Sequence, residues 1–355
     1  MIAALDATYS VGPAPSGVGV YSREILNGIA ALRPHDRFLY CYRAHRLWRG
    51  LRAVRPVNAR PTVLFESWAP FHCDIFHGLN QRLPRQRFRR TVCTFHDLFV
   101  MTSEYSTPEF RARFSKQAQE AAQRADLIVC VSEFTAAQVE DLLGVERSRL
   151  RVIRHGTRFI DPPAAGRREP WVLHVGAVQT RKNLIRLIEA FETAAPAPWR
   201  LMLAGADGYG ANLVKKRAAA SAARDRIDFM GWIDDTRLTE LYGRSSLFVF
   251  PSLDEGFGIP VLEAMAWGLP VVASNRSSLP EVCGDAALLA DPEDSEALAA
   301  AMRQLIENQA LAAELAARGQ QRARRRPWRV AAEETLRVYD ELLSQAAEGA
   351  PAGGA

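Results

Sequence analysis

The chain has 355 residues, of which 48% are hydrophobic and 24% charged, so it is long enough for about two domains and too apolar for wholesale disorder. No stretch reaches the roughly 18 uncharged apolar residues of a membrane-spanning helix, and the first residues lack a secretion signal, which predicts a cytoplasmic protein. Residues 1–165 carry 23 Lys and Arg against 15 Asp and Glu, whereas residues 166–355 carry 22 against 25, which indicates two bodies with different partners.

Strand-length apolar runs alternate with segments of helical periodicity through the first half of the chain. Such alternation is typical of a parallel sheet with helices on both faces. Ser132 stands directly before one helical segment and is predicted to be its N-cap. Strands are predicted at 2–5, 38–42, 74–77, 91–95, 127–131 and 150–153, and helices at 23–32, 110–124 and 132–143.

A proline-rich segment without periodicity, 161–170, separates this half from a second one with the same alternation. We therefore predict the α/β class, with two doubly wound Rossmann-like domains at 1–165 and 166–326 facing a cleft, where ligands bind beyond the carboxyl ends of the strands. An amphipathic helix is predicted at 327–345, and the Pro- and Gly-containing tail 346–355 is predicted to be disordered. Strands of the second half are predicted at 171–175, 199–204, 227–229, 247–250 and 271–274, and helices at 184–191, 212–222, 237–245 and 259–267.

The segment 251–274 contains the densest group of residues that could carry chemistry. Gly256 and Gly258 lie between a predicted strand and a predicted helix, where the backbone can approach a ligand and the helix N–H groups favour a phosphate or sugar oxygen. Two carboxylates, Glu255 and Glu263, stand eight residues apart on this turn and could hold two parts of one ligand. Taken alone, a helix cap and a solvated helix residue explain the two glutamates equally well.

This segment resembles the E-x7-E donor-site signature of GT-B glycosyltransferases, most closely family 4 of the retaining enzymes. The resemblance covers nearly the whole chain and is more specific in the second half. It implies the GT-B fold, with the donor bound by the second domain, the acceptor by the first, and the final helix packed back on the first domain. Further segments that match features of the family lie at 16–19, 94–98, 131–135, 176–183, 201–205, 229–235, 275–283 and 289–292.

The resemblance also implies roles for the residues of the glycine turn. Glu263 would bind the ribose hydroxyls of a nucleotide. Glu255 would hold the hydroxyls of the donor sugar, together with the backbone N–H groups of Phe257 and Gly258. Gly256 belongs to the same donor-binding turn.

Cations and a histidine complete the implied donor site. Arg181 and Lys182 would neutralise the diphosphate and stabilise the charge that develops on it as the glycosidic bond breaks. His96 follows a predicted strand of the first half, where the family places a histidine against the donor sugar. Gly17 and Gly19 would face the donor phosphate, although such a glycine pair also forms plain turns. The predicted catalytic residues are His96, Arg181, Lys182 and Glu255.

The nucleotide base would be selected by contacts near Trp232 and Leu253, which the motifs do not resolve. The overall pattern favours GDP-mannose as the donor, with UDP-sugars as the alternative. The resemblance implies that neither a cofactor nor a metal is needed, and the sequence agrees, because no Asp-x-Asp follows a strand in the expected place and Asp234 is predicted to cap a helix.

Two arginine-rich tracts lie in the first half, at 43–55 and 82–90. In the first, arginine recurs at every third residue beside a narrow apolar stripe that includes Trp48, which is typical of a basic amphipathic helix. Two interpretations stay open: contact with an anionic membrane or a lipid-diphosphate acceptor, or a solvated basic face. The candidate surface residues are Arg46, Arg49, Arg52, Arg85 and Arg87.

These observations predict a retaining transferase that moves a hexose from a nucleoside-diphosphate sugar to a hydroxyl of a glycan or a lipid-linked acceptor. Three alternatives remain at this stage. The same fold could serve a sugar-nucleotide epimerase or a sugar-nucleotide-binding protein without activity. A nucleic-acid-binding protein would use the arginine tracts, but these lack interleaved aromatic residues beyond Trp48 and Phe88, so nucleic acid is not an expected partner.

Overall fold

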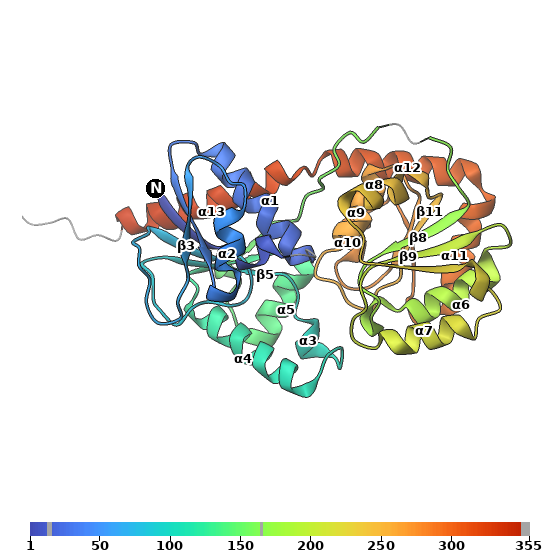
Figure 1. Ribbon diagram of the computed structural model, residues 1–355, viewed down its shortest axis with the longest axis horizontal. Helices are drawn as coiled ribbons and strands as arrows, with labels where there is room; N and C mark the ends of the chain where they lie inside the picture. Colours follow the sequence, from blue (N-terminus) through green and yellow to red (C-terminus); the bar gives the residue numbers. More distant parts are fainter. Residues whose placement is uncertain (13–15, 164–165, 349–355) are drawn as a thin grey trace, which may run out of the picture. The chain divides into compact units, whose positions relative to one another are not determined.

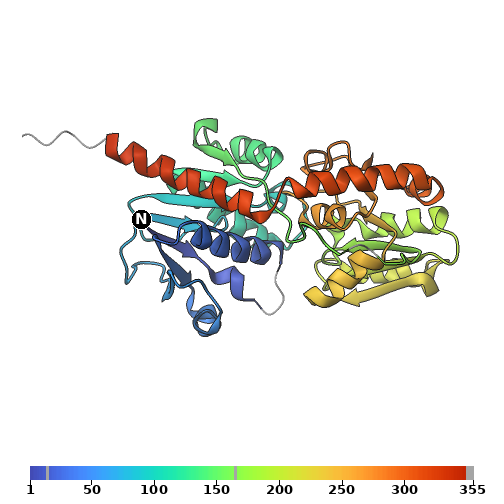
Figure 2. The same ribbon diagram turned by 90° about the horizontal axis from the view of Figure 1, so that it is seen from above.

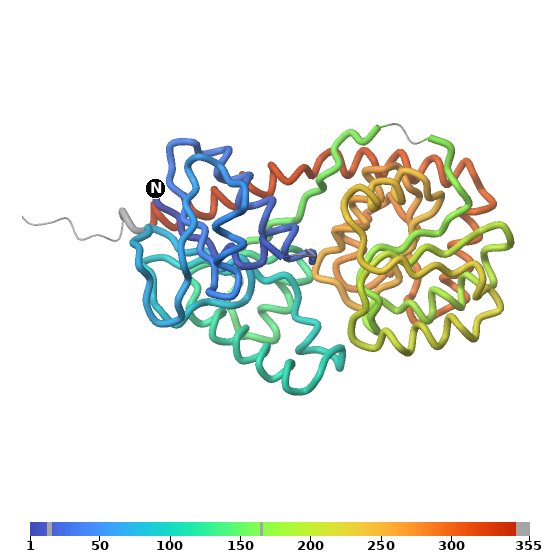
Figure 3. Tube along the Cα trace, viewed as in Figure 1, coloured from blue at the N-terminus to red at the C-terminus, as the bar shows by residue number. Residues whose placement is uncertain are grey.

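The computed structural model describes residues 1–12, 16–163 and 166–348, and the chain divides into two compact units (Figure 1). The first unit contains Met1–Thr102, Thr107–His155 and the chain from Trp328 onward. The second contains Ser103–Ser106 and Gly156–Pro327. Figure 3 traces how the chain leaves the first unit, completes the second and returns to the first in its last helix.

The first unit is built on a sheet with the strand order β3-β2-β1-β4-β5-β6-β7, and every pairing between its described strands is parallel. Its strands β4, β5 and β6 are buried along their whole length because helices cover both faces of the sheet (Figure 1). The strands are β1 (Ile2–Asp6), β2 (Arg37–Tyr42), β3 (Ala59–Val63), β4 (Ile75–Gly78), β5 (Thr91–Phe95), β6 (Leu127–Cys130) and β7 (Leu150–Val152). The helices are α1 (Gly17–Leu32), α2 (Ala44–Arg52), α3 (Phe99–Thr102), α4 (Pro108–Arg124), α5 (Glu133–Leu143) and α13 (Trp328–Glu348), with short 3-10 turns at Thr8–Val11 and Arg147–Arg149.

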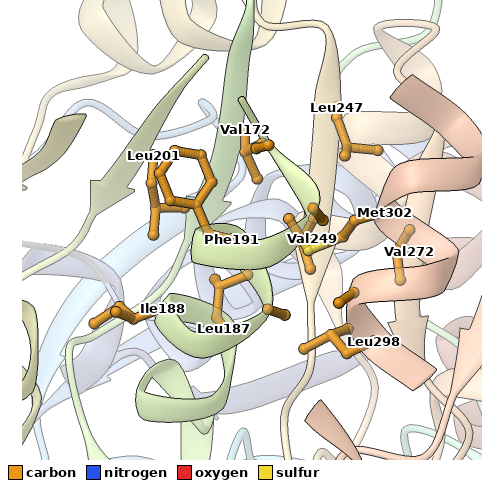
Figure 4. Packing of buried hydrophobic residues seen from close by; sticks show 14 of the residues in the cluster. Val172, Leu187, Ile188, Phe191, Leu201, Leu247, Val249, Val272, Leu298 and Met302 are labelled. Carbon is orange, nitrogen blue, oxygen red and sulfur yellow. The ribbon is translucent and has the colours of Figure 1, made fainter. Parts of the chain in front are cut away.

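The second unit repeats this architecture with the strand order β10-β9-β8-β11-β12-β13, again parallel in each described pairing. Its core forms where Leu187 and Phe191 of one helix and Leu298 and Met302 of another meet the buried face of the sheet (Figure 4). The strands are β8 (Trp171–Val175), β9 (Arg200–Ala204), β10 (Ile227–Gly231), β11 (Leu247–Phe250), β12 (Val271–Ser274) and β13 (Leu288–Ala290). The helices are α6 (Leu184–Ala194), α7 (Ala211–Ala219), α8 (Asp235–Arg244), α9 (Ile259–Ala266), α10 (Leu279–Cys283), α11 (Ser295–Glu307) and α12 (Gln309–Arg324), with short 3-10 turns at Thr180–Lys182 and Arg224–Arg226.

The last helix, α13, packs along α1 in the first unit (Figures 1 and 2). The two helices approach closely at Gly28, where an added Cβ would lie 2.7 Å from the Cβ of Ala332. Tyr339 then anchors α13 to the sheet, because its hydroxyl lies 2.6 Å from Nδ1 of His77. The C-terminal segment is therefore part of the core of the first unit.

A chain of buried polar groups runs through this core. Nε2 of His77 lies 2.8 Å from the hydroxyl of Thr94, which in turn lies 2.9 Å from the hydroxyl of Tyr21. With Tyr339, these residues connect α1, β4, β5 and α13. Each buried polar group finds its hydrogen-bond partner in the next one, where solvent cannot supply it. Burial lowers the pKa of His77 to about 3, so its ring stays neutral.

The predicted boundary at residue 165 differs from the observed division. Residues from Gly156 onward belong to the second unit, because Thr157 pairs with Pro327 and Arg158 forms ion pairs with Glu263 and Asp235. Side chains far along the chain thus decide where the first unit ends, and they leave no signal in the local sequence.

Two helix ends also differ from the predictions. Helix α1 begins at Gly17, six residues before the predicted start, because Ser16 takes an extended N-cap conformation and its carbonyl accepts a hydrogen bond from the N–H of Val20. Helix α13 continues to Glu348, so the first residues of the predicted disordered tail are helical. Alanine and glutamate at these positions are strong helix formers. The rest of that tail lies outside the described residues.

Several local predictions are confirmed. The side chain of Ser132 accepts a hydrogen bond from the N–H of Thr135 and caps α5. Asp234 caps α8 in the same way, through the N–H of Arg237. Among the described helices, none combines the length and the apolar character needed to cross a bilayer.

We predict that the free energy of unfolding falls as the pH decreases from 6.5 to 5. Burial lowers the pKa of His77 and His174 to about 3 and of His96 to about 4, from 6.5 in the unfolded chain. Below pH 6.5 the unfolded state therefore binds more protons than the folded state, and each histidine removes up to about 1.4 kcal/mol per pH unit. Urea unfolding at a series of pH values measures this slope.

The matched variants are His77→Gln, which should flatten the slope, and His35→Gln at an exposed position, which should leave it unchanged. Equal slopes in all three proteins would contradict a neutral, buried His77.

Candidate functional site

The candidate site lies where the strand order of the second unit reverses. From β8 the chain moves outward to β9 and β10, and it then returns to the other side of β8 to form β11, β12 and β13. In an open parallel sheet, ligands bind at such a point, beyond the carboxyl ends of the two central strands. The segments that follow β8 and β11 carry the residues 176–183 and 251–258, which contain most of the predicted donor residues.

These two segments bring together Arg181, Lys182 and Glu255. Nη1 of Arg181 lies 2.9 Å from Oε2 of Glu255, and Nζ of Lys182 lies 2.5 Å from Oε1 of the same carboxylate. All three residues are more than nine-tenths buried. Lys182 and Glu255, both predicted donor residues and 73 residues apart in the chain, therefore meet in one ion cluster with Arg181.

The cluster has more positive than negative charge among these three side chains. Burial by itself would raise the pKa of Glu255, but Arg181 and Lys182 outweigh it and hold the pKa at about 2. Lys182 also lies over the face of Phe250, with Nζ 4.6 Å from the ring centroid, which favours its charged form. Glu255 thus contacts two cations at the carboxyl edge of the sheet, and fixed positive charge at this place suits a site for an anionic ligand.

Unusual backbone conformations hold these side chains in place. Asn183 adopts a left-handed conformation with φ of 58°, and its Nδ2 donates hydrogen bonds to the carbonyls of Pro251 (3.1 Å) and Pro292 (2.6 Å). The N–H of Leu253 donates to the carbonyl of Arg181 at 2.9 Å. Gly258 has φ of 106°, which favours glycine, and it opens α9.

The second glutamate of the motif lies in a different environment. Glu263 on α9 is 3% exposed and accepts hydrogen bonds from Nε of Arg158 at 3.1 Å and from the hydroxyl of Tyr242 at 3.2 Å. Arg158 also donates to Asp235 at 2.8 Å. Burial raises the pKa of Glu263 above its ordinary value, although Arg158 opposes the shift. Its charge therefore depends on a single cation.

Three residues of this site were not predicted from the sequence. Arg158 and Tyr242 contact Glu263 from positions 105 and 21 residues away, and no motif marks them. His174 lies on β8 and stacks on Phe250 with ring centroids 5.3 Å apart, while its Nδ1 donates to the carbonyl of Val249 at 3.1 Å. In the sequence, it is hidden inside an apolar strand.

The other predicted donor residues of the second unit lie on neighbouring loops. Trp232 directly follows β10 and is 49% exposed. Leu253 is half-buried, and Gly256 is buried in the loop between β11 and α9. Oγ of Ser278 lies 2.8 Å from the carbonyl of Glu255 and 2.9 Å from that of Phe257, so the segment after β12 supports this loop.

The predicted site residues of the first unit are placed as follows. His96 follows β5 and is buried, with Nε2 donating to the carbonyl of Leu79 at 2.9 Å and its ring 4.6 Å from that of Tyr21. Burial lowers its pKa to about 4, so the ring is a neutral hydrogen-bonding group. Gly17 and Gly19 occupy the first turn of α1 rather than a loop before it, which corrects the predicted turn.

The arginine stripe of the first unit divides into two groups. Arg43 and Arg55 are structural: Arg43 is buried against Asp6 and Glu66, and Arg55 donates to the carbonyl of Gly50 near the end of α2. The prediction of one basic helix face over 43–55 is therefore wrong at both ends, because α2 spans only Ala44–Arg52. The candidate surface residues are Arg49, Arg52, Arg85 and Arg87, which are exposed, and Arg46, which is half-buried.

Metal-ligating side chains are not gathered at this site. Over the described residues 1–12, 16–163 and 166–348, no group of three or more His, Cys, Asp or Glu side chains is arranged to hold a metal ion.

Comparison with known proteins covers most of the chain. Residues 14–158 match the family model described as Glycosyltransferase Family 4, and residues 158–325 match that of the Glycosyl transferases group 1. The O-antigen chain mannosyltransferase B of Escherichia coli is 32% identical over 297 residues, which cover 78% of this chain and 77% of that protein.

Solved structures share the fold at lower sequence identity. Sucrose-phosphate synthase from Thermosynechococcus elongatus matches with a TM-score of 0.80 and 21% identity, covering 97% of this chain and all 100% of that one. Anabaena HepE, solved in complex with UDP-glucose, matches with a TM-score of 0.71 and 19% identity, covering 96% and 99% of the two chains.

The charge balance of the ion cluster generates a prediction. In Glu255→Gln, Arg181 and Lys182 lose their carboxylate, so the free protein should be less stable by about 3–5 kcal/mol. Inorganic pyrophosphate should then raise the melting temperature of Glu255→Gln more than that of the unchanged protein, because the anion replaces the missing charge. Differential scanning fluorimetry with increasing pyrophosphate measures both effects.

Glu192→Gln provides the control, because Glu192 forms an ion pair with Arg217 elsewhere in the same unit. Its pyrophosphate response should equal that of the unchanged protein. An equal response of Glu255→Gln would show that the cluster does not bind anions.

Proposed function

Because the chain belongs to glycosyltransferase family 4 and is a glycosyltransferase with the GT-B fold, we propose that it transfers a hexose with retention of anomeric configuration from a nucleoside-diphosphate sugar. The observation that carries this proposal is the buried cluster of Arg181, Lys182 and Glu255 at the switch point of the second sheet. It offers fixed positive charge and a fixed carboxylate in one place, which matches a diphosphate joined to a hydroxyl-rich ring.

Arg181 and Lys182 bind the diphosphate in this proposal. Negative charge grows on the leaving diphosphate as the glycosidic bond breaks, so cations held in advance stabilise the transition state more than the bound donor. Their burial strengthens this interaction, because little solvent screens it. We propose that these two cations neutralise the leaving group without a divalent metal ion and that no cofactor takes part.

Glu255 holds the donor sugar. A carboxylate with a pKa of about 2 accepts hydrogen bonds at any physiological pH, and sugar hydroxyls donate them. The backbone N–H groups of Phe257 and Gly258, in the same loop, are proposed to hold further hydroxyls of the donor sugar. With the sugar oriented in this way, the acceptor hydroxyl attacks on the face that the diphosphate leaves. Within the first unit, the neutral ring of His96 is the proposed hydrogen-bonding group for the donor sugar.

Glu263 binds the ribose hydroxyls, and Arg158 is the residue that positions it. Arg158 and Tyr242 each occupy one carboxylate oxygen of Glu263, so the carboxylate is fixed before a ligand arrives. Arg158 also opposes the upward shift that burial imposes on the pKa of Glu263, which favours the ionised carboxylate.

GDP-mannose is the proposed donor, because O-antigen chain mannosyltransferase B is a mannosyltransferase and is 32% identical to this chain. The exposed ring of Trp232 and the backbone near Leu253 would contact the base. UDP-sugars are the alternative donors, since the fold is shared with a protein solved with UDP-glucose.

The acceptor is a hydroxyl on a glycan or a lipid-linked sugar, as the O-antigen relative suggests. The exposed arginines Arg49, Arg52, Arg85 and Arg87 are the proposed contact with an anionic membrane that carries such an acceptor.

A panel of nucleotide sugars tests the proposed donor site. GDP-mannose should raise the melting temperature, and UDP-, ADP- and dTDP-sugars should do so less. Glu263→Ala and Lys182→Ala should lose this stabilisation while remaining folded, whereas Glu240→Ala and Lys216→Ala, at other positions of the same unit, should keep it. Unchanged stabilisation in Glu263→Ala and Lys182→Ala would contradict the site, and transfer with an inverted anomeric carbon, read by NMR, would contradict retention.

The role of Arg158 predicts that GDP binding depends on pH differently in Arg158→Gln than in the unchanged protein. In Arg158→Gln, burial acts on Glu263 without its opposing cation, so the pKa of Glu263 should rise further, while Tyr242 and Asp235 remain beside it. Affinity for GDP should then fall about tenfold for each pH unit below that higher pKa, at pH values where the unchanged protein still binds fully. Calorimetric titration from pH 8 to 5.5 measures this, with Arg237→Gln as control. A uniform loss of affinity at all pH values would show that Arg158 acts only as a structural residue.

A further inference from the structure

A second cluster of charged side chains lies at the carboxyl edge of the sheet in the first unit. Asp6 is the last residue of β1, and Arg43 follows β2 directly. Glu66 lies three residues beyond β3, and Arg82 lies four residues beyond β4. Because the strands are parallel and adjacent in the order β3-β2-β1-β4, these residues gather at one edge of the sheet.

Ion pairs join this cluster into a single network. Arg43 is 7% exposed; its Nη2 lies 3.4 Å from Oδ2 of Asp6, and its Nη1 contacts Oε1 of Glu66. Nη2 of Arg82 donates to the same oxygen of Glu66 at 2.6 Å. The backbone of Glu66 is fixed as well, since its carbonyl accepts a hydrogen bond from the N–H of Gln86 at 2.9 Å.

This network leaves Glu66 ionised and within reach of a ligand. Burial tends to raise its pKa, but Arg43 and Arg82 outweigh burial and lower it below the ordinary value. The side chain of Glu66 is 42% exposed and that of Arg82 is 37% exposed. The pair therefore presents a fixed hydrogen-bond acceptor beside fixed donors.

Two aromatic rings flank this carboxylate in the sequence. Phe65 and Trp68 stack on each other with ring centroids 4.9 Å apart and an interplanar angle of 16°. They are 38% and 55% exposed, which is unusual for two large apolar side chains in contact. The segment thus combines a flat, rigid apolar surface with a charged hydrogen-bonding pair.

We propose that Phe65, Glu66, Trp68 and Arg82 form a binding site for a pyranose ring of the acceptor glycan. A pyranose has an apolar face of C–H groups, which fits against an aromatic ring, and a rim of hydroxyls, which donate to a carboxylate and accept from a guanidinium. Arg43 is a positioning residue, because it is buried between Asp6 and Glu66 and sets the orientation of the Glu66 carboxylate. This site rests on the proposed glycosyl transfer and specifies which part of the acceptor the first unit recognises.

The charge of Glu66 distinguishes this ligand from a lipid surface. An ionised carboxylate that stands next to Phe65 in the chain would repel anionic headgroups and would oppose insertion of this segment into a bilayer. The exposed arginines of α2, such as Arg49 and Arg52, are the side chains that suit a membrane. A saccharide uses both the rings and the carboxylate.

Saturation-transfer NMR and calorimetric titration of the full chain test this site, with methyl α-mannoside and an α-linked mannobiose as probes. Trp68→Ala and Phe65→Ala should weaken saccharide binding about tenfold, and Glu66→Gln should weaken it severalfold. Phe110→Ala is the matched control, because Phe110 is an aromatic residue of the same unit that is 39% exposed. It should bind both saccharides as the unchanged protein does.

The response of each variant to GDP, measured in parallel, separates this proposal from the donor site. If Trp68→Ala binds the saccharides with unchanged affinity, or if the unchanged protein binds GDP but neither saccharide, the pyranose site is overturned and the proposed function stands. If GDP fails to bind while saccharide binding depends on Trp68, the pyranose site is supported and the donor assignment fails. If Trp68→Ala loses binding to vesicles of phosphatidylglycerol yet keeps saccharide binding, the segment is a membrane contact and the proposal is wrong.

Discussion

The structure of the second unit depends on one constraint: Arg181, Lys182 and Glu255 must be buried together. A buried charge is tolerated only when it is paired at close range, so a small displacement of any partner would be costly. The surrounding backbone meets this requirement through the left-handed Asn183 and through Gly258. The strained and polar features of the loops after β8 and β11 are therefore consequences of holding three charges at the point where the sheet order reverses.

The first unit uses the same principle at the corresponding edge of its own sheet. There Arg43 is buried between Asp6 and Glu66, and a second arginine, Arg82, approaches from the next loop. In both units an arginine and a carboxylate from different strand ends fix one another, and in the first unit the side chains of Glu66 and Arg82 are also partly exposed. Parallel sheets favour this arrangement because the carboxyl ends of all their strands lie at the same edge.

The sequence predicts a feature well when the residues that determine it are close together in the chain. The loop between β11 and α9 was predicted because Glu255, Gly258 and Glu263 lie within nine residues, and the caps at Ser132 and Asp234 because capping is local. Edge strand β3 was missed because Pro61 interrupts its pattern, which an edge position tolerates. Arg43 was assigned to a surface stripe because its spacing is regular, whereas its burial depends on Asp6 and Glu66. The contact between Arg158 and Glu263 joins residues 105 positions apart, so no local pattern could reveal it.

Burial acts on Glu255 and Glu263 alike, but the outcome differs because the number of neighbouring cations differs. Two cations hold the pKa of Glu255 near 2, whereas one arginine leaves that of Glu263 above its ordinary value. Glu255 therefore belongs to the permanent charge of the site, while Arg158 favours the carboxylate form of Glu263 against the effect of burial. A ligand that bridges the two glutamates meets one group with a strongly lowered pKa and one with a raised pKa. The segment at Arg158, where the chain returns to that unit after His155, thus influences the charge of Glu263 as well as forming part of the connection between the two units.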